Sequence, residues 1–168
     1  SHVIHHSSTR YNLSTALRQT WTGLITGKLI FWFWLPLVGF HPIMIVTMKS
    51  INLIYQFWIH TEAIKKMPRI FELIFNTPSH HRVHHGTDSI YVDKNYAGIF
   101  IIWDKLFNTF QPEMHTPKYG ILHNIKSYNP FYIATHEWID MLRDLKWKNG
   151  IVKNFNYIFK PPEWKHKN

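Results

Sequence analysis

Residues 14–60 read STALRQTWTGLITGKLIFWFWLPLVGFHPIMIVTMKSINLIYQFWIH, an apolar and aromatic stretch that decides the fold. Pro36, Gly39 and Pro42 interrupt it in the middle and mark a turn. The turn leaves two arms, 14–35 and 42–60, each of about 20 residues and about 30 Å long if helical, nearly enough to cross a bilayer. We therefore expect an all-α membrane protein built around an apolar helical hairpin. Because Lys28 and Lys49 lie inside the arms and the mean hydropathy is -0.22, two buried helices of a soluble bundle are the alternative.

Composition limits the chemistry of the chain. Its 168 residues give room for one domain, and the absence of cysteine excludes disulfide scaffolds, thiolate metal sites and cysteine nucleophiles. Any metal must therefore be held by nitrogen or oxygen. The 13 His and 8 Trp residues favour histidine-ligated metal sites and membrane interfaces. The sequence begins at Ser1 with a His cluster directly after it, so we expect a fragment of a longer protein.

The charge indicates which partners to expect. The formal net charge is +9, but the basic residues are spread along the chain without a dense stripe or a recognition-helix pattern. We therefore expect no nucleic-acid partner. Under the positive-inside rule, these basic residues place the His clusters on the cytoplasmic face of the membrane.

One histidine pattern carries the chemistry. His-x-x-His-His occurs twice, as His2, His5 and His6 and again as His81, His84 and His85. On a helix, positions i, i+3 and i+4 share one face, so each motif would direct three imidazoles at a common point, as in metal binding. Both motifs can serve one site only if the segment between them crosses the membrane an even number of times. The hairpin satisfies this condition and predicts a metal centre at the membrane surface, within reach of a buried alkyl chain.

Further candidate ligands lie close to the two motifs. His60 ends the second arm with Gln56 one turn earlier, whereas His80 would point off the face shared by the second motif. Four acidic residues are candidates for accepting a hydrogen bond from the ring nitrogen that does not bind metal, and so for orienting the imidazoles: Glu62, Asp88, Asp93 and Asp104. Six or seven histidines exceed the three or four that a single zinc ion uses, which favours two ions. Neutral imidazole suits iron, zinc and copper alike, so the metal stays open at this point.

The strings HVIHH, QFWIH and HRVHH, in this order around an apolar hairpin, resemble the fatty acid hydroxylase and sterol desaturase superfamily of membrane di-iron enzymes. Within it, HHSSTRYNLSTALRQ, NTPSHHRVHHG and DKNYAGIFIIWDKLFNTF are similar to the alkylglycerol monooxygenase branch and its bacterial relatives. The resemblance implies that residues 1–168 are the C-terminal part of a single helical membrane domain. The hairpin would cover about 14–60, and a His-rich cytosolic metal-binding lid would cover about 61–168 together with 1–13.

The resemblance also implies a ligand set and its limits. It assigns metal ligation to His2, His5, His6, His60, His81, His84 and His85. It puts Gln56 where the family has a histidine, which makes Gln56 a departure or a weak oxygen ligand. It places a further His box upstream of Ser1. The catalytic group is the metal centre itself, so no separate acid or base is assigned.

The implied activity is an iron-dependent monooxygenase with two Fe ions, O2 as co-substrate and tetrahydrobiopterin as electron donor. It would hydroxylate the ether-linked carbon of an alkylglycerol, giving glycerol and a fatty aldehyde. One alternative is a hydroxylase or desaturase of fatty acids, sterols or carotenoids with the same metal centre, in which a redox protein can replace the pterin. Another is a non-catalytic membrane protein that holds zinc. The expected location is the endoplasmic reticulum in a eukaryote or the inner membrane in a bacterium.

Overall fold

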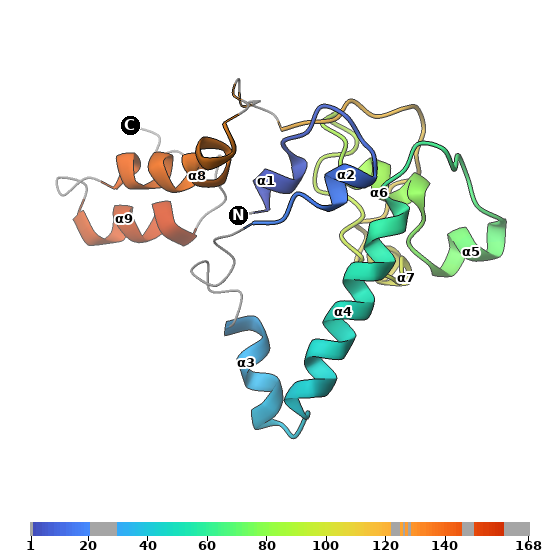
Figure 1. The fold of residues 1–168 in the computed structure, drawn as a ribbon, viewed down its shortest axis with the longest axis horizontal. Coiled ribbons are helices and arrows are strands. Elements are labelled where there is room, and N and C mark those ends of the chain that lie inside the picture. The colour runs from blue at the N-terminus through green and yellow to red at the C-terminus, as the bar shows by residue number, and fades with distance from the viewer. Residues whose placement is uncertain are drawn as a thin grey trace. The chain divides into compact units, whose positions relative to one another are not determined.

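The computed structural model describes residues 2–20, 30–121, 125, 127, 129–145 and 150–159. The described residues are mostly helical and contain no strand, only two isolated antiparallel bridges, Phe75 with Phe100 and Gly86 with Tyr119. The chain divides into two compact units, Ser1–Ile125 and Lys126–Asn168. The first unit contains α1 (Val3–His6), α2 (Leu13–Ala16), α3 (Ile30–Leu37), α4 (Pro42–Ile59), α5 (Arg69–Ile74), α6 (Pro78–His84) and α7 (Ile102–Leu106) (Figure 1).

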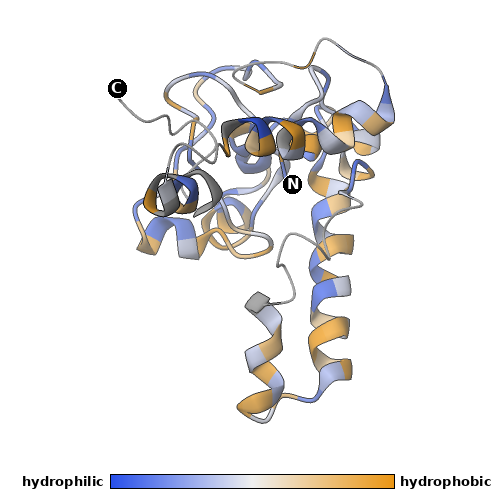
Figure 2. Ribbon diagram, turned by 90° about the vertical axis from the view of Figure 1, so that its left-hand side faces the viewer, coloured by the Kyte–Doolittle hydropathy of each residue, from blue (hydrophilic) through white to orange (hydrophobic). Residues whose placement is uncertain are grey.

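Helices α3 and α4 form the predicted hairpin, with its turn at the end far from α1, α2 and α6 (Figure 1). Gly39 takes a φ of +100° in this turn, a conformation that favours glycine. Helix α4 starts at Pro42 because the preceding His41 side chain accepts a hydrogen bond from the backbone N–H of Ile43 and because proline suits the first helical position. Figure 2 shows apolar residues along both helices.

The first arm differs from the prediction of one continuous helix. Asn12 begins the short helix α2 with a capping box, in which its side chain and that of Thr15 each accept a backbone hydrogen bond. The helix ends at Ala16, and residues 17–20 are not helical. Residues 21–29 of the arm, which include Lys28, lie outside the described residues. Among the residues that the structure describes, no helix combines the length and the apolar character needed to cross a membrane.

The core of the first unit lies at the end of α4 that is remote from the turn. Helices α2 and α6 pack against α4 there, and α1 packs against α2. Ile59 and Val83 are fully buried at this junction. Most other buried side chains of the unit are polar, and they include five histidines: His5, His60, His80, His81 and His85. The interior is therefore organised around imidazoles and polar contacts.

The second unit is a pair of packed helices, α8 (Pro130–Asp144) and α9 (Gly150–Phe159). The side chain of Asn129 caps α8 by accepting hydrogen bonds from the backbone N–H groups of Phe131 and Tyr132.

Candidate metal centre

The histidines of the two motifs and His60 converge in the first unit and form two groups. The buried group consists of His5, His60, His81 and His85, and the outer group consists of His2, His6 and His84. Within each group the candidate ligand nitrogens all lie within 4.8 Å of one another. The structure therefore brings together all seven histidines that the sequence singles out as ligands.

Three separate elements supply the buried group. His5 comes from α1, His60 directly follows α4, and His81 and His85 come from α6 and its end. Nε2 of His60 lies 3.0 Å from Nε2 of His5 and 3.1 Å from Nε2 of His81. All four side chains are buried, with at most 7% of each residue exposed. Four imidazoles from distant parts of the sequence thus enclose one small volume.

Each motif is divided between the two groups, which differs from the expected convergence of three imidazoles on one point. Successive residues of an α-helix are turned by about 100°, so the adjacent His84 and His85 point in different directions. His85 joins His81, one helical turn earlier, in the buried group, while His84 joins the outer group. In α1, His5 and His6 diverge in the same way. Two groups of ligands therefore follow from helix geometry.

Backbone carbonyls set the orientation of two of these rings. Nδ1 of His60 lies 2.6 Å from the carbonyl oxygen of Gln56, and Nδ1 of His84 lies 3.2 Å from that of Lys94. A carbonyl oxygen can only accept a hydrogen bond, so Nδ1 carries the hydrogen in each neutral ring. The Nε2 atoms of both rings therefore present their lone pairs for ligation.

Burial keeps the imidazoles neutral. Together with the charges of neighbouring imidazoles, it lowers the pKa of His5 to about 3 and that of His6 to about 2. Burial also lowers the pKa values of His81 and His85 well below the ordinary range. At pH 7 these rings are unprotonated, which is the form that binds a metal ion.

The donor set fits a metal ion. Three buried ring nitrogens, Nδ1 of His5, Nδ1 of His81 and Nε2 of His85, have no hydrogen-bond partner in the described part of the chain. The ring hydrogen of His60 is on Nδ1, so its Nε2 cannot donate to the facing Nε2 atoms of His5 and His81. A cation among these three nitrogens would replace the repulsion between their lone pairs with ligation. Uncharged imidazole nitrogen without thiolate suits iron, zinc or copper.

His80 lies outside both groups, although it is as buried as its neighbour His81. Its Nε2 is 2.8 Å from Oε2 of Glu72. The same carboxylate accepts hydrogen bonds from the hydroxyls of Thr77 and Ser79 and from the backbone N–H of Met67. His80 and Glu72 therefore anchor the start of α6 to α5.

The predicted oxygen-bearing residues have other partners. The backbone carbonyl of Gln56 holds His60, while its side-chain amide nitrogen lies beside Gly98. The carboxylates accept hydrogen bonds elsewhere: Glu62 from the hydroxyl of Tyr119, Asp88 from the backbone N–H of Lys118, Asp93 from the hydroxyl of Tyr96, and Asp104 from the backbone N–H groups of Tyr96 and Ala97. The Nδ1 atoms of His60 and His84 thus donate to backbone carbonyl oxygens and not to these carboxylates.

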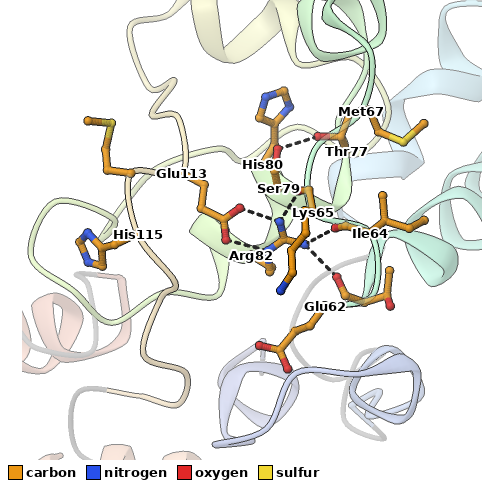
Figure 3. Close-up of polar contacts among 12 residues, drawn as sticks. Glu62, Ile64, Lys65, Met67, Thr77, Ser79, His80, Arg82, Glu113 and His115 are labelled. Carbon is orange, nitrogen blue, oxygen red and sulfur yellow. Dashed lines mark hydrogen bonds and ion pairs between the residues drawn. The ribbon is translucent and has the colours of Figure 1, made fainter.

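Sequence reasoning missed two residues that hold the centre together. The ring of Tyr11 is 3% exposed, stacks on His60 at 5.5 Å and donates its hydroxyl to the carbonyl of Ile59 at 3.0 Å. Arg82 is buried inside the second motif and pairs with the partly exposed Glu113 (Figure 3). The position of Arg82 between two ligand candidates was the available signal, whereas Tyr11 has no local signal because its partners are 48 or more residues away.

Comparisons with known proteins give a consistent relationship. A family model described as fatty acid hydroxylase matches residues 1–109. Alkylglycerol monooxygenases from Homo sapiens and Danio rerio are each 44% identical, over 164 and 166 residues, which covers 97% of this chain and 36% of each relative. The one from Caenorhabditis elegans is 41% identical over 177 residues, with 97% and 34% covered. The chain spans about a third of the length of the curated relatives it matches. No solved structure matches it.

Proposed function

This chain belongs to the fatty acid hydroxylase family, and we propose that it carries the histidine centre of a di-iron, O2-dependent monooxygenase acting on alkylglycerols. The reaction would hydroxylate the ether-linked carbon and yield glycerol and a fatty aldehyde. The observation that carries the proposal is the convergence of two histidine groups around buried, neutral ring nitrogens. Similarity to alkylglycerol monooxygenases along nearly the whole chain supports the choice of substrate.

We propose that each group holds one ion. The buried group would use four imidazoles and the outer group three: His5, His60, His81 and His85 for the first ion, and His2, His6 and His84 for the second. When bound, the ions would supply the reduction of dioxygen and the insertion of one oxygen atom into a C–H bond.

The other residues of the centre exclude water and fix the rings. Tyr11 covers the buried group by stacking on His60, and its hydroxyl is used by the carbonyl of Ile59 rather than pointing at the ligands. Carbonyls behind His60 and His84 hold both rings in the tautomer with a free Nε2. The electrons would come from tetrahydrobiopterin, with a redox protein as the alternative donor.

We propose that the α3–α4 hairpin places this centre in a membrane, with the histidines on the cytoplasmic side. The support is exposed apolar surface, which in large amounts marks membrane or partner contacts. Side chains more than half exposed include Phe33, Leu37, Ile43, Val46 and Ile54 on the hairpin, and Ile70, Leu73, Leu106 and Phe107 around α5 and α7. The membrane would be the endoplasmic reticulum or, in a bacterium, the inner membrane.

The test uses the full-length protein in membranes, with its iron content measured. We expect tetrahydrobiopterin-dependent release of fatty aldehyde from a 1-O-alkylglycerol and no aldehyde from the matching 1-acylglycerol. His84→Ala should abolish turnover, whereas His115→Ala should not, because the His115 side chain is half exposed and lies 3.5 Å from Asp88. An iron-loaded protein that releases no aldehyde would contradict the proposed substrate, and equal activity of the two variants would contradict the proposed ligands.

A further inference from the structure

Arg82 is a buried cation inside the second histidine motif. Only 3% of the residue is exposed, and it lies on α6 between His81 and His84. Its Nε donates to Oε1 of Glu113 at 2.7 Å, and one terminal nitrogen donates to Oε2 of Glu113 at 2.6 Å. A buried guanidinium is costly unless its charge is paired and its N–H groups are satisfied. Glu113 supplies the charge pairing.

The remaining N–H groups of Arg82 bind one short segment of backbone. They donate to the carbonyl oxygens of Thr61 at 3.0 Å, Ile64 at 2.7 Å and Lys65 at 2.6 Å (Figure 3). With the two bonds to Glu113, all five N–H donors of the guanidinium are used. The three carbonyls belong to the segment that directly follows His60. Arg82 therefore ties α6 to the chain at the point where His60 leaves α4.

We propose that Arg82, paired with Glu113, is a positioning residue that sets the separation of His60 from His81 and so selectively maintains the buried metal site. The proposal rests on the metal centre proposed above. The buried group needs His60, which lies next to the segment held by Arg82, whereas the outer group takes its members from residues 2–6 and from α6. Loosening Arg82 should therefore weaken the buried site and spare the outer one.

Lysine cannot replace this arrangement. Its ammonium group carries three donors on a flexible stem, whereas the planar guanidinium of Arg82 reaches a carboxylate and three carbonyls at once. Arg82→Lys keeps the charge opposite Glu113 but must give up carbonyl bonds. Glu113→Gln is the complementary change, because it keeps the arginine and its three carbonyl bonds but removes the compensating charge. We expect a smaller loss from Glu113→Gln than from Arg82→Lys.

The experiment titrates Co²⁺ into the metal-free, full-length protein and follows the cobalt absorption spectrum and bound stoichiometry. His60→Ala and His84→Ala identify the spectral signatures of losing the buried and the outer site. Arg82→Lys should weaken the buried site by about 10- to 100-fold, the usual effect of losing groups that orient ligands, and should reproduce the His60→Ala signature. Arg69→Lys, the same change at an exposed position on α5, should match the unsubstituted protein.

Each outcome decides the proposal. Retained outer-site binding in Arg82→Lys shows that the variant is folded, so loss of the buried site alone supports selective positioning. Equal weakening of both sites in Arg82→Lys and Glu113→Gln would overturn it in favour of a general role in folding. Unchanged binding at both sites would also overturn it. If the unsubstituted protein binds no Co²⁺, the proposed metal centre itself fails, which is a distinct result and removes the positioning role with it.

Discussion

Replacing His80 and His81 by alanine, one at a time, should separate metal binding from structural stability in two adjacent residues. Both lie on α6 and are equally buried, each 3% exposed. Nε2 of His81 faces Nε2 of His60 at 3.1 Å, whereas Nε2 of His80 faces the carboxylate of Glu72 at 2.8 Å. The two substitutions remove the same imidazole from the same helix, so they control for each other.

His81→Ala should remove the stabilisation that metal confers. A ligand at 100 times its dissociation constant stabilises the folded state by about 2.7 kcal/mol, and the buried site's share of the difference between metal-loaded and metal-free protein should vanish. His80→Ala should keep the difference but lower the stability of both forms. This substitution leaves the buried carboxylate of Glu72 with three of its four hydrogen-bond donors. We expect it to lower the free energy of unfolding by about 2 to 3 kcal/mol, which is less than the roughly 3 to 5 kcal/mol lost when a buried charge keeps no partner at all.

The measurement is denaturant unfolding of the full-length protein with and without Fe²⁺ under anaerobic conditions. Bound iron is counted in parallel. A smaller metal-dependent increment in His80→Ala, or an undiminished one in His81→Ala, would refute the assignment of the two residues. Parallel losses in both variants would show that α6 acts as one unit and that the division between ligand and anchor is wrong.

Three further predictions test other parts of the structure. Lowering the pH from 7.5 to 5.5 should destabilise the metal-free protein by about 3 kcal/mol through His5 and His6 alone. Both imidazoles have a pKa near 6.5 in the unfolded chain but only about 3 and about 2 in the folded one, so the unfolded state binds more protons over this range. Denaturant midpoints measured across this pH range check the prediction, and a flat profile would contradict it. Asn12→Ala should cost about 1 kcal/mol, seen as a lower Tm, because α2 loses its capping box. Gly86→Ala should cost about 1 to 3 kcal/mol in urea unfolding, because the added Cβ would lie 2.9 Å from the Tyr91 ring; an unchanged midpoint would refute this packing.

The local elements of the fold were predictable from sequence because their signals are local. Gly39 and Pro42 lie at the turn of the hairpin, and α4 starts at Pro42 and ends at Ile59, one residue short of the expected arm. Pro36 does not end the first arm as expected, because it lies inside α3, which continues to Leu37. The start of the first arm was not predicted correctly. Its apolar pattern is compatible with a long helix, but the capping box at Asn12 nucleates a separate short one.

The site was predictable in its members but not in its arrangement. Spacing alone identified the histidines of both motifs, since the i, i+3 and i+4 pattern is local. It did not identify which ring shares a group with which, because His5 meets His60 across 55 residues and His60 meets His81 across 21. The bonds of Arg82 to the backbone after His60 were likewise not predictable, since they depend on how two helices pack.

The buried histidine group also links parts of the chain that are far apart in the sequence. An ion held by His5, His60 and His81 would close two loops, of 55 and 21 residues, in the manner of a reversible cross-link. Closing a loop restricts the unfolded chain by an amount that grows only logarithmically with its length, so the long loop adds little to the cost over the short one. The ion would therefore stabilise the folded chain relative to the unfolded one, and iron loading would report that the end of α4 lies beside α1 and α6.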